Sequence, residues 1–234
     1  MSQDFLYLIN KEDLTHKNLF EVIYPNKTIN YYLSDDFSEE FYIQLCLFGF
    51  ISTSINIEEQ IYLLPEIQFE YAILDFNNLH ISKKVKKLIN KNNFKFFINH
   101  NLEAVISKIK SYHKDSWIEE NYENLLLNLK NHKKTNFDFE LFCVELYDLE
   151  DNLIAGEIGY KINKTYTSLT GFSSKNKSYK DWGKLQMVLL GLYLKNENFI
   201  FWNLGHPYMQ YKFDLGAKLY SREDFLNRWL KAVL

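Results

Sequence analysis

Apolar residues along this chain follow two different spacings, and the change between them predicts its elements. In the first part, a repeat of three or four residues predicts amphipathic helices at 82–91, 100–111 and 119–131. Ser38 is a suitable N-cap for an earlier helix that ends near Gly49. Residues 61–76 alternate or run apolar, as strands do. We therefore expect a region of mixed helices and strands before residue 131.

From Phe139 onward the pattern becomes that of extended strands. It predicts three strands in succession, at 139–147, 153–162 and 164–172. An amphipathic helix from about Gly183 and a strand at 198–204 follow, and a last helix opens at Ser221 with a capping box. This order of a meander, a helix, a strand and a helix is that of the acetyltransferase-like (GNAT-like) fold. Other α+β folds share it.

The stretch between the two regions, near 131–138, is polar and charged, which is typical of a linker or long turn. We therefore predict an α+β protein with a small mixed N-terminal domain over 1–78 and an acetyltransferase-like domain over 79–234. The second domain begins with a helical lead-in over 79–131. A chain of 234 residues, 47% hydrophobic, suffices for the cores of both.

Composition excludes several classes of function. Cys46 and Cys143 form neither a CxxC pair nor a Cys/His cluster, and their apolar neighbours indicate buried free thiols. The sequence has no zinc-ligand spacing, no P-loop and no catalytic Ser/His/Asp pattern, so we expect no metal and no cofactor. The first residues lack the basic and apolar pattern of a signal peptide, and no apolar run reaches membrane-spanning length, so we expect neither segment. We expect a cytoplasmic monomer.

The formal net charge of −3 argues against extensive coating by nucleic acid, but the lysines are unevenly placed. On a helix capped by Ser82, the apolar residues face the core and the lysines spread over the exposed side. These lysines are Lys83, Lys84, Lys86, Lys87, Lys91 and Lys95. A solvated helix face and a phosphate-binding patch explain them equally well. Local basic groups suit an RNA end better than a long duplex, because a few phosphate contacts position a strand.

Several short segments carry a resemblance. They are Ser116-Trp-Ile118, Cys143-Val-Glu-Leu-Tyr147, Asn152-Leu-Ile-Ala-Gly-Glu-Ile-Gly159, Leu215-Gly-Ala217 and Ser221-Arg-Glu-Asp-Phe-Leu226. In this order they resemble the Thr-Trp-Ile, Ser-(Ile/Leu)-Glu-Val-Trp, Glu-Leu-Val-Gly-Gly-Met-Tyr-Gly, Leu-Gly-Ala and Pro-Arg-x-Phe-Leu segments of the leucyl/phenylalanyl-tRNA–protein transferases. The resemblance spans roughly residues 28–230, and its collinear order carries more weight than any single motif.

This resemblance implies an enzyme that takes Leu or Phe from an aminoacyl-tRNA. It joins the amino acid to the N-terminal amine of a protein that begins with Lys or Arg, which marks that protein for degradation. The reaction requires an apolar slot for the aminoacyl side chain, a platform for the terminal adenosine and a group that orients or deprotonates the amine. The resemblance implies that Trp117 is the platform, and that Phe172 and Ser173 line the slot. A core tryptophan and an ordinary strand end are the corresponding structural explanations.

The resemblance also implies an altered centre. Leu169 stands where the family has a Glu, and Asn203 and Gly205 stand where it has an Asp and a Gln that orient and deprotonate the amine. An Asn orients an amine but does not accept its proton. His206, beside the strand end, or Glu157 is then the candidate base.

A further departure is the segment Leu63-Leu-Pro-Glu-Ile-Gln-Phe69, which replaces the family's Trp-Trp-Ser-Pro-Asp-Pro-Arg and its substrate or tRNA contacts.

Two classes of function stay open. The first is a transferase in which positioning and the reactive ester do most of the work, since proximity contributes up to about 7–11 kcal/mol in well-oriented cases. The second is a catalytically altered member that binds RNA or an aminoacyl end, or an acyltransferase with another donor. A coenzyme A enzyme is less favoured, because the turn over 175–183 has no Gly-x-Gly pattern. Convergence of Trp117, Phe172 and Asn203 on one cleft beside the Lys83–Lys95 face would favour the transferase.

Overall fold

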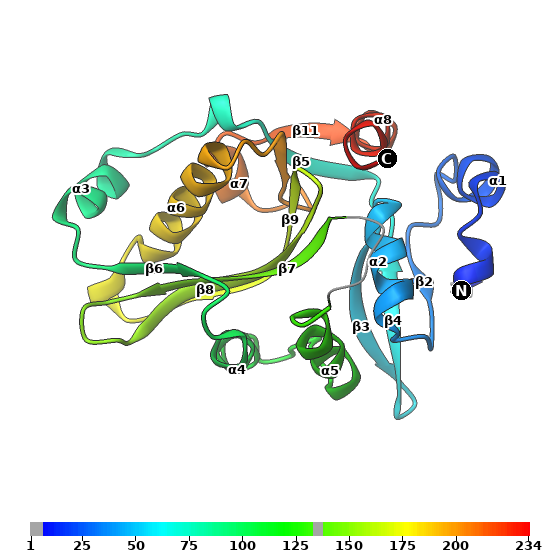
Figure 1. Cartoon of the computed structure of the whole chain (residues 1–234), viewed down its shortest axis with the longest axis horizontal. Helices are drawn as coiled ribbons and strands as arrows, with labels where there is room; N and C mark the ends of the chain where they lie inside the picture. Colours follow the sequence, from blue (N-terminus) through cyan, green and yellow to red (C-terminus); the bar gives the residue numbers. More distant parts are fainter. Residues whose placement is uncertain (1–6, 133–137) are drawn as a thin grey trace.

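A mixed sheet of seven strands forms the centre of the protein, whose computed structural model describes residues 7–132 and 138–234 (Figure 1). In spatial order the strands are β11 (Lys218–Ser221), β5 (Glu70–Leu74), β10 (Phe201–Asn203), β9 (Thr165–Ser173), β8 (Leu153–Ile162), β7 (Phe139–Tyr147) and β6 (Lys95–Ile98). Only β9 and β10 pair in parallel within this sheet. The predicted meander is therefore present as β7–β8–β9, and the α+β class is confirmed.

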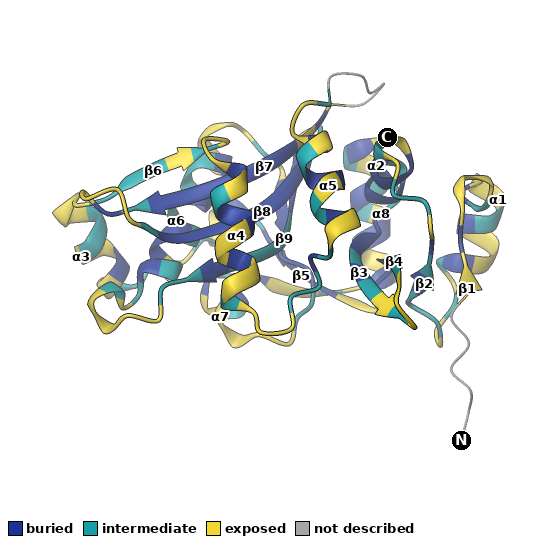
Figure 2. Cartoon of the chain, turned by 90° about the horizontal axis from the view of Figure 1, so that it is seen from below, coloured by how far each residue is buried: buried dark blue, intermediate teal, exposed yellow. Residues whose placement is uncertain are grey.

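Helices cover both faces of this sheet. The helices α3 (Lys83–Lys91) and α6 (Trp182–Asn196) lie on one face, and α4 (Leu102–Tyr112) and α5 (Glu120–Leu129) lie on the other (Figure 1). We call these the α6 face and the α4 face. Figure 2 shows the buried strands β7, β8 and β9 behind α4 and α5. Because successive side chains of a strand point to opposite faces, Phe201 joins the apolar cluster of the α4 face and Trp202 that of the α6 face.

The N-terminal part packs beside the α4 face. Its hairpin consists of β3 (Ile51–Ile57) and β4 (Gln60–Glu66), next to α2 (Glu39–Leu47) and α8 (Arg222–Val233). The shorter elements are β1 (Tyr7–Leu8), η1 (Lys11–Asp13), α1 (His16–Asn18), η2 (Leu19–Ile23), β2 (Tyr32–Leu33), η3 (Phe76–Asn78), η4 (Lys177–Tyr179) and α7 (Gln210–Asp214). None of the helices within the two described ranges combines the length and the apolarity that a membrane span needs.

The predicted helices begin at the expected caps. The Oγ atoms of Ser38, Ser82 and Ser221 each accept a backbone N–H of the first turn that follows. The helix expected at 100–111 begins at Leu102, because Asn101 is its N-cap.

The strand expected at 198–204 is shorter. Phe199 N–H bonds the Leu194 carbonyl at the end of α6, and Ile200 N–H bonds the Lys164 carbonyl, so β10 starts only at Phe201.

The domain division stays a prediction. The strand β5 precedes the boundary proposed after residue 78 but lies between β10 and β11 in the large sheet. That sheet therefore contains residues from both sides of the boundary. Of the predicted linker, residues 133–137 lie outside the described part of the chain.

A buried guanidinium joins the N-terminal part to the rest. Arg222, at the start of α8, is 6% exposed and donates to five backbone carbonyls. The acceptors are Tyr24 (3.4 Å), Asn26, Ile29 (3.3 Å), Ile67 (2.6 Å) and Gln68 (3.0 Å). Arg222 forms no ion pair within the described residues, so backbone dipoles and the Phe69 ring, 4.5 Å from the guanidinium carbon, meet its charge.

We predict that Arg222→Met lowers the free energy of unfolding by about 3–5 kcal/mol, because it leaves several buried carbonyls without donors. Chemical denaturation measures the loss. The control is Arg228→Met on the same helix, where the side chain is partly exposed and pairs with Asp75. Its cost is about 1 kcal/mol. Equal losses in the two variants would contradict the role of the carbonyls.

Candidate active site

The short strand β10 ends at Asn203, and beyond this point β9 has a neighbouring strand on one side only. Asn203 lies opposite Thr167 of β9 on one side and Ile73 of β5 on the other. Beyond Thr167, β9 continues to Ser173 and pairs only with β8. The register of β8 and β9 shifts so that Leu169 has no partner, which makes it the extra residue of a β-bulge. Asn203 thus stands where β9 loses one neighbouring strand, beside a bulge.

A histidine and a carboxylate meet directly after this strand. Gly205 has φ +71°, a conformation that glycine adopts readily, and the chain turns there so that His206 faces Glu66. His206 Nε2 lies 2.8 Å from Glu66 Oε2, and the ring stacks on Tyr208 with centroids 5.1 Å apart. Glu66 is 5% exposed and also accepts Asn30 Nδ2 at 2.7 Å.

His206 Nδ1 makes no hydrogen bond within the described residues, and 35% of the side chain is exposed. When Nε2–H donates to Glu66, Nδ1 carries a lone pair. A carboxylate that orients an imidazole in this way leaves its second nitrogen available to accept a proton.

Buried polar atoms without partners gather near these residues. Gln68 Oε1, Thr167 Oγ1 and Ser52 Oγ are buried and make no hydrogen bond within the described residues. Thr167 is the strand partner of Asn203 on β10 and of Tyr160 on β8. The Tyr160 hydroxyl donates to the Phe50 carbonyl at 3.2 Å. Such atoms cost about 1–3 kcal/mol each when unsatisfied.

Asn203 itself is oriented as a donor. Its Oδ1 accepts the Gly205 N–H at 2.9 Å, and its Nδ2 makes no hydrogen bond within the described residues. The side chain is 1% exposed and, like that of Phe201, points to the α4 face. Asn203 therefore offers an N–H donor on this face.

The other predicted site residues fall on two sides of the sheet. Leu169, Phe172 and Trp117 pack into the apolar cluster of the α4 face, where Trp117 meets Tyr122 edge-on with centroids 4.9 Å apart. The Ser173 side chain lies against Gly183 at the start of α6. The lysines predicted to contact tRNA are exposed on α3, which packs on α6: Lys83, Lys84, Lys86 and Lys87. The structure brings the apolar residues to the side of Asn203 and places Ser173 and the lysines on the other.

Glu157, the alternative base, belongs to a network on the α6 face. Its carboxylate accepts Ser168 Oγ (2.7 Å), Tyr166 OH (3.0 Å) and Gln186 Nε2 (3.2 Å). Burial raises the pKa of Glu157. Because Ser168 also accepts Trp202 Nε1 at 2.8 Å, the network shares the face of Trp202, opposite to that of Asn203.

A buried lysine that the sequence analysis missed holds the turn of His206. Lys212 of α7 is 7% exposed, and its Nζ donates to the carbonyls of Leu204 (2.5 Å) and His206 (2.7 Å). Burial lowers the pKa of Lys212 to about 8, although the charge of Glu157 opposes this shift. The segment has no periodicity that marks a buried position, so only the fold identifies it.

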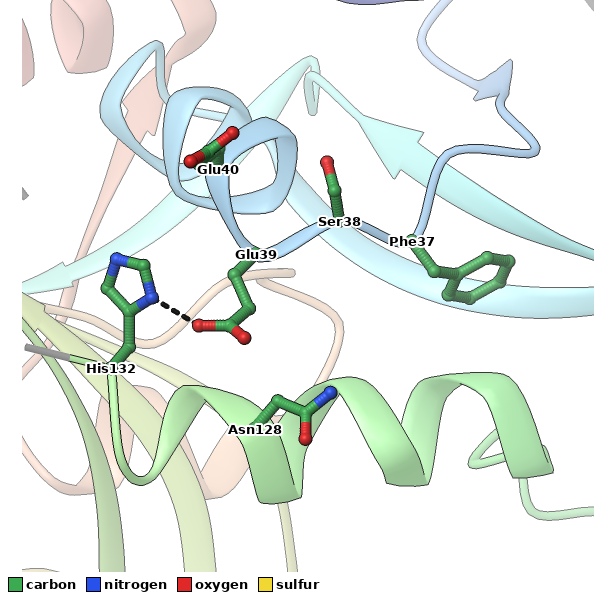
Figure 3. Close-up of a pocket in the computed structure, with 6 residues that line it drawn as sticks. All are labelled: Phe37, Ser38, Glu39, Glu40, Asn128 and His132. Atoms are coloured by element: carbon green, nitrogen blue, oxygen red, sulfur yellow. Dashed lines mark hydrogen bonds and ion pairs between the residues drawn. The ribbon is translucent and has the colours of Figure 1, made fainter. Parts of the chain in front are cut away.

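A separate hollow of about 370 Å³ opens between the start of α2 and the end of α5. Its lining residues are Phe37, Ser38, Glu39, Glu40, Asn128 and His132, and Glu39 bonds His132 (Figure 3). None of the predicted site residues lines it.

Comparisons with known proteins point in one direction. The family model described as leucyl/phenylalanyl-tRNA protein transferase matches residues 73–230. The leucyl/phenylalanyl-tRNA–protein transferase of Maridesulfovibrio salexigens is 30% identical over 159 residues, which cover 66% of this chain and 62% of that protein. The protein of the same name from Flavobacterium johnsoniae is 26% identical over 159 residues, which cover 66% and 69%. This chain thus spans less than two thirds of the first relative.

Among solved structures, L-PGS from Bacillus licheniformis has a TM-score of 0.42 and 14% identity, over 75% of this chain and 51% of that one.

We predict that Lys212 makes stability depend on pH. Its folded pKa of about 8 lies below the ordinary 10.5, so the unfolded state binds more protons between these values and stability rises with pH across this window. Between pH 8 and 10.5, the free energy of unfolding of the wild type rises by up to about 3 kcal/mol relative to that of Lys212→Met. Denaturant titrations from pH 7 to 11 measure it. The control Lys184→Met removes an exposed lysine and leaves the rise intact.

Proposed function

Because the chain belongs to the leucyl/phenylalanyl-tRNA–protein transferase family, we propose that it transfers Leu or Phe from an aminoacyl-tRNA to the N-terminal amine of proteins that begin with Lys or Arg. The observation that carries the proposal is the contact between Glu66, at the end of β4, and His206, just beyond the end of β10. It supplies a proton acceptor in a centre where Leu169 and Asn203 stand in place of the carboxylates that the resemblance implies.

In the proposed reaction the amine nitrogen attacks the ester carbonyl carbon. A C–N bond forms, and the ester C–O bond to the terminal adenosine breaks. His206 Nδ1 takes a proton from the amine and returns it to the leaving ribose oxygen, while Glu66 stabilises the imidazolium. Asn203 Nδ2 is suited to bind the carbonyl oxygen, on which negative charge develops.

The apolar residues suit the donor amino acid. Leu169 and Phe172 belong to the apolar cluster on the α4 face, where a Leu or Phe side chain is buried favourably. Trp117, half-buried in the same cluster, is the proposed stacking surface for the terminal adenosine. Because α3 lies on the α6 face, its lysines bind phosphates farther from the ester.

A second candidate is a member that binds an aminoacyl end without turnover. The observation in its favour is that Leu169 and Asn203 both lack a charge on the face where the chemistry is proposed.

We predict that the wild type transfers radiolabelled Leu or Phe from charged tRNA to a protein with N-terminal Arg or Lys. Trp117→Ala weakens this transfer by raising KM for the aminoacyl-tRNA, since a stacked base is worth about 1–3 kcal/mol. Asn203→Asp does not increase it, because His206 already accepts the proton. Binding of tRNA without transfer by the wild type, with activity restored by Asn203→Asp, would establish the binding module instead.

A second prediction concerns the base. His206→Gln lowers kcat by roughly 10²–10⁴-fold, the usual contribution of a general base. Glu66→Gln causes a smaller loss, because the amide still bonds the imidazole but does not stabilise its charge. The control is His80→Gln, an exposed histidine outside the site, which keeps full activity. Activity of His206→Gln equal to that of the control would remove His206 from the mechanism.

A further inference from the structure

One acceptor atom near the proposed centre has no donor among the described residues. Gln68 lies between β4 and β5 and is 2% exposed. Its backbone is fixed on both sides, since its N–H bonds Tyr71 OH at 2.9 Å and its carbonyl accepts Arg222 Nε. Its Nε2 donates to Glu66 Oε2 at 3.4 Å, but Oε1 has no partner within the described residues. The carboxamide is thus held in place with its oxygen unused.

The Gln68 side chain lies beside the turn that follows β10. A Cβ atom on Gly205 would stand 3.8 Å from Gln68 Nε2 and 3.6 Å from Ile51 Cδ1. Gly205 separates the segment of Asn203 from His206, and Gln68 and His206 bond the same oxygen of Glu66. A Cβ there would make ordinary van der Waals contact with the carboxamide, so Gln68 lies directly beside this turn.

The neighbouring acceptors are already engaged. Asn203 Oδ1 accepts the Gly205 N–H, and Glu66 accepts Asn30, Gln68 and His206. The unpartnered hydroxyls of Ser52 and Thr167 donate as well as accept. An amide oxygen only accepts, so Gln68 Oε1 is free to accept an N–H or O–H from outside the described residues.

A neutral amine that attacks an ester carries two N–H groups beside its lone pair. One of them points to the base, and the other needs an acceptor in a site that excludes water. We propose that Gln68 Oε1 accepts this second N–H of the incoming N-terminal amine, while His206 Nδ1 takes the first proton. This inference rests on the proposed function and makes Gln68 a residue that binds the protein acceptor.

The test is a thermodynamic cycle that combines one change in the protein with one change in the acceptor peptide. Wild type and Gln68→Met are compared on a peptide with a free N-terminus and on the same peptide with an N-methylated terminus. The neutral methylated amine keeps one N–H, which goes to the base. We expect Gln68→Met to raise KM for the free peptide roughly 3- to 10-fold, the effect of one neutral hydrogen bond. Its effect on the methylated peptide is much smaller.

Two further measurements separate binding from structure. KM for the aminoacyl-tRNA stays unchanged in Gln68→Met. The free energy of unfolding falls by no more than about 1 kcal/mol, because the lost oxygen had no partner and the only side-chain hydrogen bond removed is the long one from Nε2 to Glu66. The control Gln186→Met removes a buried carboxamide on the α6 face that bonds Glu157. It lowers stability and leaves the ratio of KM for the two peptides as in the wild type.

The outcomes are distinct. No transfer by the wild type overturns the proposed function, and this inference with it. Transfer by the wild type with an equal KM for the free peptide in Gln68→Met overturns the inference alone. An equal loss on both peptides overturns it too, because it shows that Gln68 acts on the fold and not on the amine.

Discussion

The rest of the structure depends on the Arg222 guanidinium and the carbonyls around it. Burying a charge without a carboxylate partner is favourable only where enough dipoles point at it, and five carbonyls from two separate segments do so here. Two of these carbonyls belong to Ile67 and Gln68, next to Glu66. The position of Glu66 fixes His206, whose carbonyl is held in turn by Lys212. A structural interaction at the start of α8 thus positions the proposed base.

Local patterns predicted the elements well, because caps and apolar spacing act over a few residues. Ser38, Ser82 and Ser221 begin their helices as expected. The neighbours of a strand are set by long-range pairing, which no local pattern contains. The strand β5, from the first third of the chain, therefore lies between β10 and β11, which come from its last part. The sequence alone does not predict that these three strands share a sheet. The strand β10 is shorter than predicted for a similar reason, because the N–H groups of Phe199 and Ile200 bond the carbonyls of Leu194 and Lys164.

The candidate site was predicted in part. Asn203, Gly205 and His206 are consecutive or nearly so, and a resemblance along the chain was enough to find them. Glu66 and Gln68 lie in the segment where that resemblance lapses, and their relevance comes from contacts across the fold. Lysines are rarely buried, so nothing in the sequence marked Lys212. Glu157 was a reasonable candidate by residue type, but strand alternation places it on the α6 face.

The distribution of charge is consistent with a centre that has neutral residues at its strand positions. Leu169 and Asn203 carry no charge on the α4 face, and the nearby carboxylate of Glu66 lies within hydrogen-bond distance of His206 Nε2. In the proposed reaction, an apolar slot beside a neutral donor keeps water from the ester and strengthens each polar contact within it. A carboxylate at position 203 would be a second buried anion near Glu66, and burial works against its ionisation. The proposed base, His206, is held by Glu66 at the edge of the site and keeps contact with solvent. It therefore avoids the cost of burying a second anion, and it still lies close to the end of β10.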